Sequence, residues 1–161
     1  MNSRRSVLAL VATVATIAGL ALLLPRWRAV PIDAAGTVRL ADCDLNNGPC
    51  VVTLDGDRRV EFSIAPRPVP VMQPLRLRLA TQGFAAPLNA QVDFVGVDMD
   101  MGFNRVDLKP AADGTLGGEA SLPVCVTGTM DWQAELLLRR PDHAVPTRIR
   151  FRFAAPLSAG R

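Results

Sequence analysis

Alternation of apolar and polar residues with a period of two recurs in several segments after residue 31. In segment 147–153 three apolar residues alternate with three arginines, and segments 75–79 and 91–95 repeat the pattern. Because successive side chains of a strand point to opposite faces, each segment would bury one face and expose the other. The pattern predicts β-strands rather than helices, with the arginines covering the solvent face of a sheet.

Six further short runs with strand character are separated by turn-forming pairs such as Asn47-Gly48, Asp55-Gly56 and Asp113-Gly114. They cover residues 37–40, 51–54, 60–64, 105–108, 118–122 and 132–138. Short strands that recur at such spacing are typical of a β-sandwich. We therefore expect an all-β domain over residues 37–153, an antiparallel β-sandwich of seven to nine strands, followed by a tail at 154–161.

The N-terminal region contains Val7–Leu24, a run of 18 residues without a charge that ends at Pro25. That length meets the threshold for a membrane span. A secretory signal peptide would have a shorter apolar region followed closely by a cleavage site of small residues. We therefore expect a single transmembrane helix within an uncleaved anchor at residues 1–28, and a linker at 29–36.

Two readings of the residues before this run stay open. Segment Ser3–Ala9 resembles a twin-arginine export signal, but Arg4 and Arg5 also suffice simply to hold the N-terminus in the cytoplasm. Under both interpretations, residues 31–161 would be exported across the membrane. We expect a single-pass protein of the bacterial inner membrane, which contacts the membrane through residues 7–24 and carries its C-terminal domain in the periplasm.

Charge and histidine content exclude several functions. Four of the 18 basic residues flank the apolar run, which leaves 14 against 15 acidic residues in the rest of the chain. A domain near neutrality lacks the basic patch that nucleic-acid binding needs. The single histidine excludes multi-histidine zinc sites and leaves one candidate base for a serine triad. No glycine-rich phosphate loop occurs. We expect a protein that is not an enzyme.

Three cysteines allow three single disulfides, each of which leaves one thiol. Cys43 and Cys50 bracket a segment rich in turn formers, so this pairing is favoured. A bond from either of them to Cys125 across the sandwich remains an alternative, as does a fully reduced state.

The sulfur-bearing residues suggest a metal preference. Met99 and Met101 share one face of an extended segment, and Cys125 lies between two predicted strands. With Met130 as a further thioether in reach after folding, these groups would suit a soft ion. Thiolate and thioether ligands select Cu(I) over hard cations. We expect Met99, Met101, Cys125 and Met130 to form the site, with Met72 as a spare thioether.

Other roles for the same residues stay open. Methionines at alternate strand positions are often core residues, and a cysteine beside a proline is often just a small buried residue. Asp98 and Asp100 would form only an incomplete calcium cage. Thiol oxidoreduction through Cys125 with one of the other cysteines would have no Cys-x-x-Cys motif to lower a thiol pKa. His143, in an apparent exposed turn, is a weak candidate base for a reactive Cys125.

A sequence of short motifs resembles a known family. Residues 99–102 (Met-Asp-Met-Gly), the Asp113-Gly114 turn with Gly117-Gly118, and Gly128 followed by Trp132 are similar to the FixH and YtkA-like family of small exported domains. The resemblance covers residues 98–138. It implies an immunoglobulin-like β-sandwich behind an N-terminal membrane anchor, and a role near copper handling or the assembly of haem-copper cytochrome oxidases.

The resemblance also implies roles for particular residues. The family's metal-associated methionines correspond to Met99 and Met101, and its tryptophan corresponds to Trp132 as a core residue. This chain departs from the pattern by its three cysteines and by lacking the histidine often found near the methionines. Those departures leave the identity of the ion open, and thiol redox chemistry is an alternative to metal binding.

The sequence therefore predicts a membrane-anchored periplasmic accessory protein that binds Cu(I), with a haem-copper oxidase or its assembly factors as partner. The alternative is a metal-free, immunoglobulin-like adaptor subunit of a membrane complex, and a thiol redox protein is a third possibility.

Overall fold

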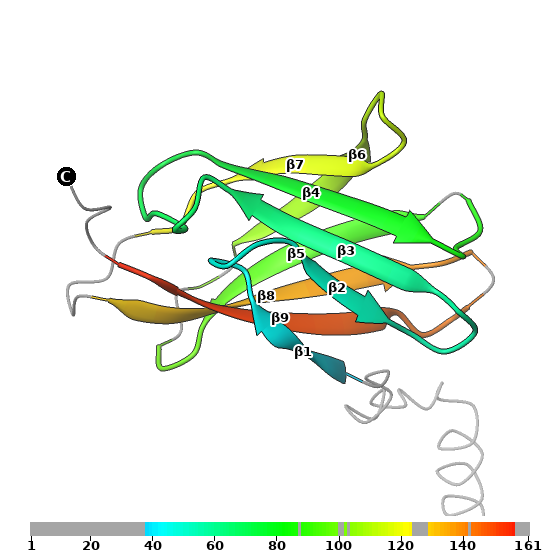
Figure 1. Cartoon of the computed structure of the whole chain (residues 1–161), viewed down its shortest axis with the longest axis horizontal. Helices are drawn as coiled ribbons and strands as arrows, with labels where there is room; N and C mark the ends of the chain where they lie inside the picture. Colours follow the sequence, from blue (N-terminus) through cyan, green and yellow to red (C-terminus); the bar gives the residue numbers. More distant parts are fainter. Residues whose placement is uncertain are drawn as a thin grey trace, which may run out of the picture. The chain divides into compact units, whose positions relative to one another are not determined.

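The computed structural model describes residues 38–86, 88–99, 102, 104–123, 129–141 and 143–156. These residues form an all-β unit of nine strands without a helix (Figure 1), which confirms the predicted class. The strands are β1 (Val38–Asp44), β2 (Cys50–Thr53), β3 (Arg59–Ala65), β4 (Leu75–Gln82), β5 (Asn89–Gly96), β6 (Arg105–Pro110), β7 (Leu116–Ala120), β8 (Met130–Arg139) and β9 (Thr147–Ala155).

Each of the nine runs with strand character overlaps one of these strands. The last strand is longer than predicted, because β9 continues through Ala154 to Ala155, whose side chain is fully buried. Both residues thus belong to the sheet rather than to the expected tail. Within the described part of the chain, no helix is long and apolar enough to cross a membrane. The predicted anchor and linker at residues 1–36 lie outside that part.

The strands are hydrogen-bonded in the order β1-β9-β8-β5-β6-β7-β4-β3-β2. β1 runs parallel to β9, and all other neighbours are antiparallel. β6 joins two layers, since Arg105–Leu108 pairs with β5 while Lys109 and Pro110 pair with β7. The sheet folds over on itself into a nearly closed barrel, with β1 and β2 as its two edges (Figure 1).

The core lies between the two layers. Phe62 of β3 and Phe151 of β9 are far apart in the strand order, yet their ring centroids lie 5.2 Å apart. Phe94 of β5 meets Phe153 edge-on at 6.3 Å. Trp132 of β8 is completely buried beside them. These aromatic contacts hold the layers together, and Trp132 is a core residue as expected.

The alternating arginines lie on the outer face, as predicted. Arg152 is exposed. Arg148 and Arg150 both donate to Glu135 of β8, with N···O distances of 3.1 and 2.8 Å. The Glu135 side chain is only 12% exposed, so the two guanidiniums compensate a carboxylate that is largely removed from water.

The predicted turn at Asp113-Gly114 connects β6 and β7. Gly114 has φ = 78°, in the left-handed region that favours glycine. The Asp113 carboxylate accepts hydrogen bonds from the Thr115 hydroxyl (2.6 Å) and the Thr115 backbone N–H (3.1 Å), and pairs with Arg78 at 3.1 Å. The Thr115 hydrogen bonds, followed by Arg78, lower the pKa of Asp113 from 3.8 to about 2.

This lowered pKa predicts a pH-dependent contribution to stability. The folded state holds Asp113 ionised more strongly than the unfolded state, so the contribution is present above about pH 4 and is lost as the pH falls toward 2. We expect Asp113→Asn to flatten the dependence of the unfolding free energy on pH between 4 and 2, as measured by urea unfolding. An Asp113 carboxyl signal that titrates near 3.8 in a carbon-detected NMR experiment would contradict this account.

Candidate functional site

One end of the barrel collects the sulfur-bearing residues. β1, β3, β5, β7 and β9 finish there, and β2, β4, β6 and β8 begin there, because the strands run up and down in turn. We call it the sulfur end, on the left of Figure 1. Its described sulfur-bearing residues are Cys43, Cys50, Met72, Met99 and Met130.

Three hydrogen bonds hold the loops of the sulfur end side by side. The Val97 N–H donates to the carbonyl of Asp131 at 2.9 Å, which joins the β5–β6 loop to the start of β8. The Asn104 side-chain amide donates to the carbonyl of Ser121 at 3.0 Å. The Met72 N–H donates to the carbonyl of Leu122 at 2.9 Å. The β3–β4, β5–β6 and β7–β8 loops therefore form one surface.

The two described ligand candidates have different environments. Met99 is 43% exposed in the β5–β6 loop, where a thioether is open to solvent. Met130 begins β8, is 7% exposed and belongs to the hydrophobic core. The hydrogen bond from Val97 to Asp131 joins a residue two positions before Met99 to the residue directly after Met130. Met72 is 67% exposed in the neighbouring β3–β4 loop.

The other two ligand candidates, Met101 and Cys125, lie outside the described residues. Their nearest described neighbours are Met99 and Gly102 on one loop, and Pro123 and Thr129 on the other. Within the described ranges, no group of three or more His, Cys, Asp or Glu side chains is arranged to hold a metal ion. Asp98 is described and exposed, whereas Asp100 is not described.

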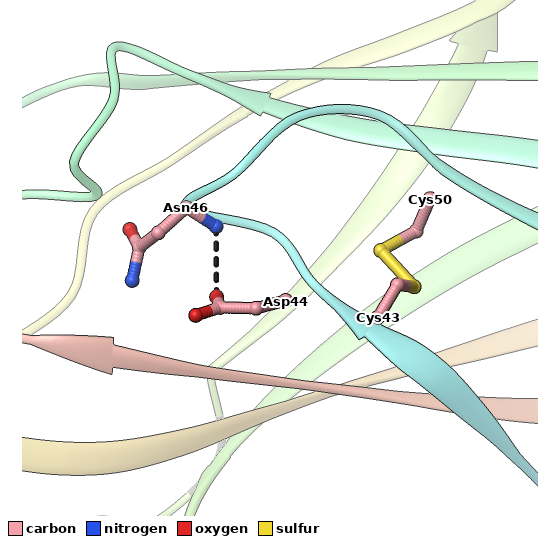
Figure 2. The surroundings of a disulfide bond; sticks show 4 residues. All are labelled: Cys43, Asp44, Asn46 and Cys50. Carbon is pink, nitrogen blue, oxygen red and sulfur yellow. Dashed lines mark hydrogen bonds between the residues drawn. A yellow bond between two sulfur atoms is a disulfide. The ribbon is translucent and has the colours of Figure 1, made fainter.

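Cys43 at the end of β1 and Cys50 at the start of β2 form a disulfide, with their Cα atoms 5.9 Å apart (Figure 2). This is the pairing that the sequence favoured. It excludes the alternatives that join Cys43 or Cys50 to Cys125, and it leaves Cys125 as the odd cysteine of the chain. The disulfide connects the two edge strands of the barrel.

The loop inside the disulfide is organised by Asn46, whose role the sequence did not reveal. Its backbone N–H donates to Asp44 Oδ1 at 2.9 Å (Figure 2). Its side-chain amide donates to the carbonyl of Ala154 at 2.8 Å and accepts from the Val69 N–H at 2.8 Å. Asn46 thus ties the β1–β2 loop to β9 and to the β3–β4 loop. The only sequence signal was an asparagine in a turn-rich segment.

A hollow of about 280 Å³ opens between the disulfide and the start of the β5–β6 loop. Cys43, Asp44, Val97, Asp131 and Arg152 are among the residues that line it. Trp132 also contributes to its wall, and the indole N–H of this residue is buried without a hydrogen-bond partner among the described residues. Two carboxylates and one guanidinium therefore surround an opening at the sulfur end.

Comparison of the chain with protein-family models, curated proteins and solved structures found no match.

Proposed function

We propose that this chain is a membrane-anchored periplasmic protein that binds Cu(I) through Met99, Met101, Cys125 and Met130. The observation that supports the site is the convergence of loops: the β5–β6 loop carries Met99, the β7–β8 connection leads into Met130, and hydrogen bonds hold the flanks of both together. The described neighbours of Met101 and Cys125 lie in these same two loops.

The chemistry of these groups favours a soft ion. Thiolate and thioether ligands select Cu(I). Met99 is accessible to an incoming ion, while the buried Met130 would approach it from the core side. Because Cys43 and Cys50 pair with each other, no other cysteine of the chain is left to pair with Cys125, whose sulfur is therefore proposed as a ligand. The disulfide is also typical of an exported domain.

The wider assignment follows the family resemblance. The proposed fold is a variant of the immunoglobulin-like β-sandwich of the FixH and YtkA-like family, in which two layers remain joined through β6. The proposed anchor is residues 7–24, and the proposed partner is a haem-copper oxidase or one of its assembly factors. No bond-making chemistry is required of the protein, which would hold or pass on the ion.

The test is a Cu(I) titration of the full chain in neutral detergent against a competing chelator, with ascorbate as reductant so that the disulfide stays intact. We expect Cys125→Ser and Met101→Leu each to weaken Cu(I) binding at least about tenfold, as loss of groups at a metal site does. Leucine conserves the volume of methionine. Met72→Leu is the matched comparison, because it removes the exposed, spare thioether of the same end, and it should weaken binding less than the other two substitutions. Unchanged affinity in Cys125→Ser and Met101→Leu would rule out the assignment.

A second candidate function is a metal-free adaptor, and one observation favours it. Val95, Val97 and Met99 are exposed by 39, 48 and 43%, and they alternate along the end of β5 and the loop after it. Exposed apolar side chains in a row are typical of a protein-binding surface. If the purified protein binds no Cu(I), while Val97→Asp releases it from a larger complex in solubilised membranes, the adaptor function replaces the copper function.

A further inference from the structure

A second hollow, of about 290 Å³, lies at the end of the barrel opposite the sulfur end. β1 begins there, and the turns after β2 and β8 form its walls. Three arginines and the only histidine of the chain line it: Arg39, Arg58, Arg140 and His143. Asp55 is the one carboxylate among the described residues of its lining. Among these described residues, basic side chains therefore outnumber acidic ones, in a domain that is otherwise close to neutral.

Asp55 orients two of these arginines. Its carboxylate accepts from Arg39 Nη2 at 2.7 Å, and its backbone carbonyl accepts from Arg58 Nε at 2.8 Å. The Asp55 side chain is 84% exposed, so its pairing with Arg39 is well solvated and weak. The guanidinium of Arg58 also lies over the ring of Phe84, 5.7 Å from its centroid. These contacts hold Arg58 in place before any ligand arrives.

Arg58 retains an unused donor. Its Nη1 atom is buried and has no hydrogen-bond partner among the described residues. A buried donor without an acceptor lowers the stability of the fold, and a charged donor lowers it more. A guanidinium presents its donors in a planar fork that fits phosphate oxygens.

We propose that this hollow binds a phosphate group, and that the group belongs to the headgroup of an anionic phospholipid. Among the described residues of the lining, three guanidiniums stand beside one carboxylate, which suits a ligand with a net negative charge.

The position of the hollow supports the lipid source. The chain enters the domain at Val38, beside Arg39, and Val38 follows the apolar run at Leu24 by 14 residues. An extended segment of that length reaches at most about 50 Å, so the proposed anchor would keep this domain within that distance of the membrane. This step rests on the proposed anchor, whereas the phosphate site itself rests only on the residues of the hollow.

The test is calorimetric titration of the full chain in neutral detergent with three probes: dihexanoylphosphatidylglycerol, dihexanoylphosphatidylcholine and inorganic phosphate. We expect the anionic lipid to bind at least about tenfold more tightly than the zwitterionic one. Arg58→Gln and Arg140→Gln should each weaken its binding about tenfold or more. Arg76→Gln is the matched control, because it removes an exposed arginine near the sulfur end. Circular dichroism of each variant checks that it is folded.

Several outcomes would overturn the proposal. The phosphate site would be ruled out if none of the three probes bound, or if binding persisted in both Arg58→Gln and Arg140→Gln. Binding of inorganic phosphate without the lipid would overturn the lipid source. Release of the full chain from membranes by alkaline carbonate would contradict the anchor, and the titration with inorganic phosphate would still report on the hollow. Cu(I) titration probes the other end, so failure of the copper function is distinguishable from failure here.

Discussion

Phe62→Ala and Phe151→Ala are each expected to lower the free energy of unfolding by about 3 to 5 kcal/mol. Both side chains are completely buried, and they meet across the two layers with their ring centroids 5.2 Å apart. Each substitution would remove a large apolar surface and leave a cavity that close-packed strands cannot fill. Urea unfolding followed by far-UV circular dichroism measures the loss.

The double variant tests whether the layers are coupled at this contact. Because the two rings touch, the combined loss should fall short of the sum of the single losses by about 0.5 to 1.5 kcal/mol. Val51→Ala, at a 42% exposed position on the edge strand β2, is the control and should change stability little. Additive losses would mean that the two layers do not share this part of the core.

Loss of the disulfide has the second largest expected effect. The bond closes a loop of eight residues from Cys43 to Cys50, and the chain-entropy model assigns about 2.5 kcal/mol to a loop of that size. We expect reduction with dithiothreitol to lower the unfolding free energy by about that amount. The edges β1 and β2 would separate first, because their hydrogen-bonded neighbours β9 and β3 lie on their other sides.

Comparison of two proteins separates the disulfide from side effects of the reductant. The variant that combines Cys43→Ala with Cys50→Ala lacks the bond, so dithiothreitol should leave its stability unchanged. Its stability should lie slightly below that of the reduced natural chain, because alanine at the buried position 50 removes core volume. Equal stability of the oxidised and reduced natural chain would contradict a constraining role for the bond.

The local pattern of the sequence was sufficient to locate the strands. In a strand, the alternation shows directly which side chains become buried on folding. In β9, Ile149, Phe151 and Phe153 are buried, and the arginines between them face outward. The same alternation could have predicted that Met130 is a core residue, because every second residue lies on one face of a strand and Met130 is two residues before Trp132 in β8. Its burial was therefore readable from the sequence, whereas the exposure of Met99 depends on a loop.

Contacts between distant segments were not readable in this way. Asn46 bonds to Ala154, 108 residues away, and Arg39 shares a hollow with Arg140 and His143. Such contacts depend on the order of the strands, and in particular on the parallel pairing of β1 with β9. No periodicity within a strand encodes the identity of its neighbour.

The amino-acid sequence by itself determined the strand segments, their buried faces and the turns, because each of these follows from side chains that are adjacent in the chain. It also favoured the pairing of Cys43 with Cys50, because only a short turn separates them. Only the tertiary structure decided that the sheet folds over so that loops with sulfur-bearing residues meet at one end and arginines at the other. The reason is that long-range strand pairing reflects the packing of the whole core, to which every strand contributes at once.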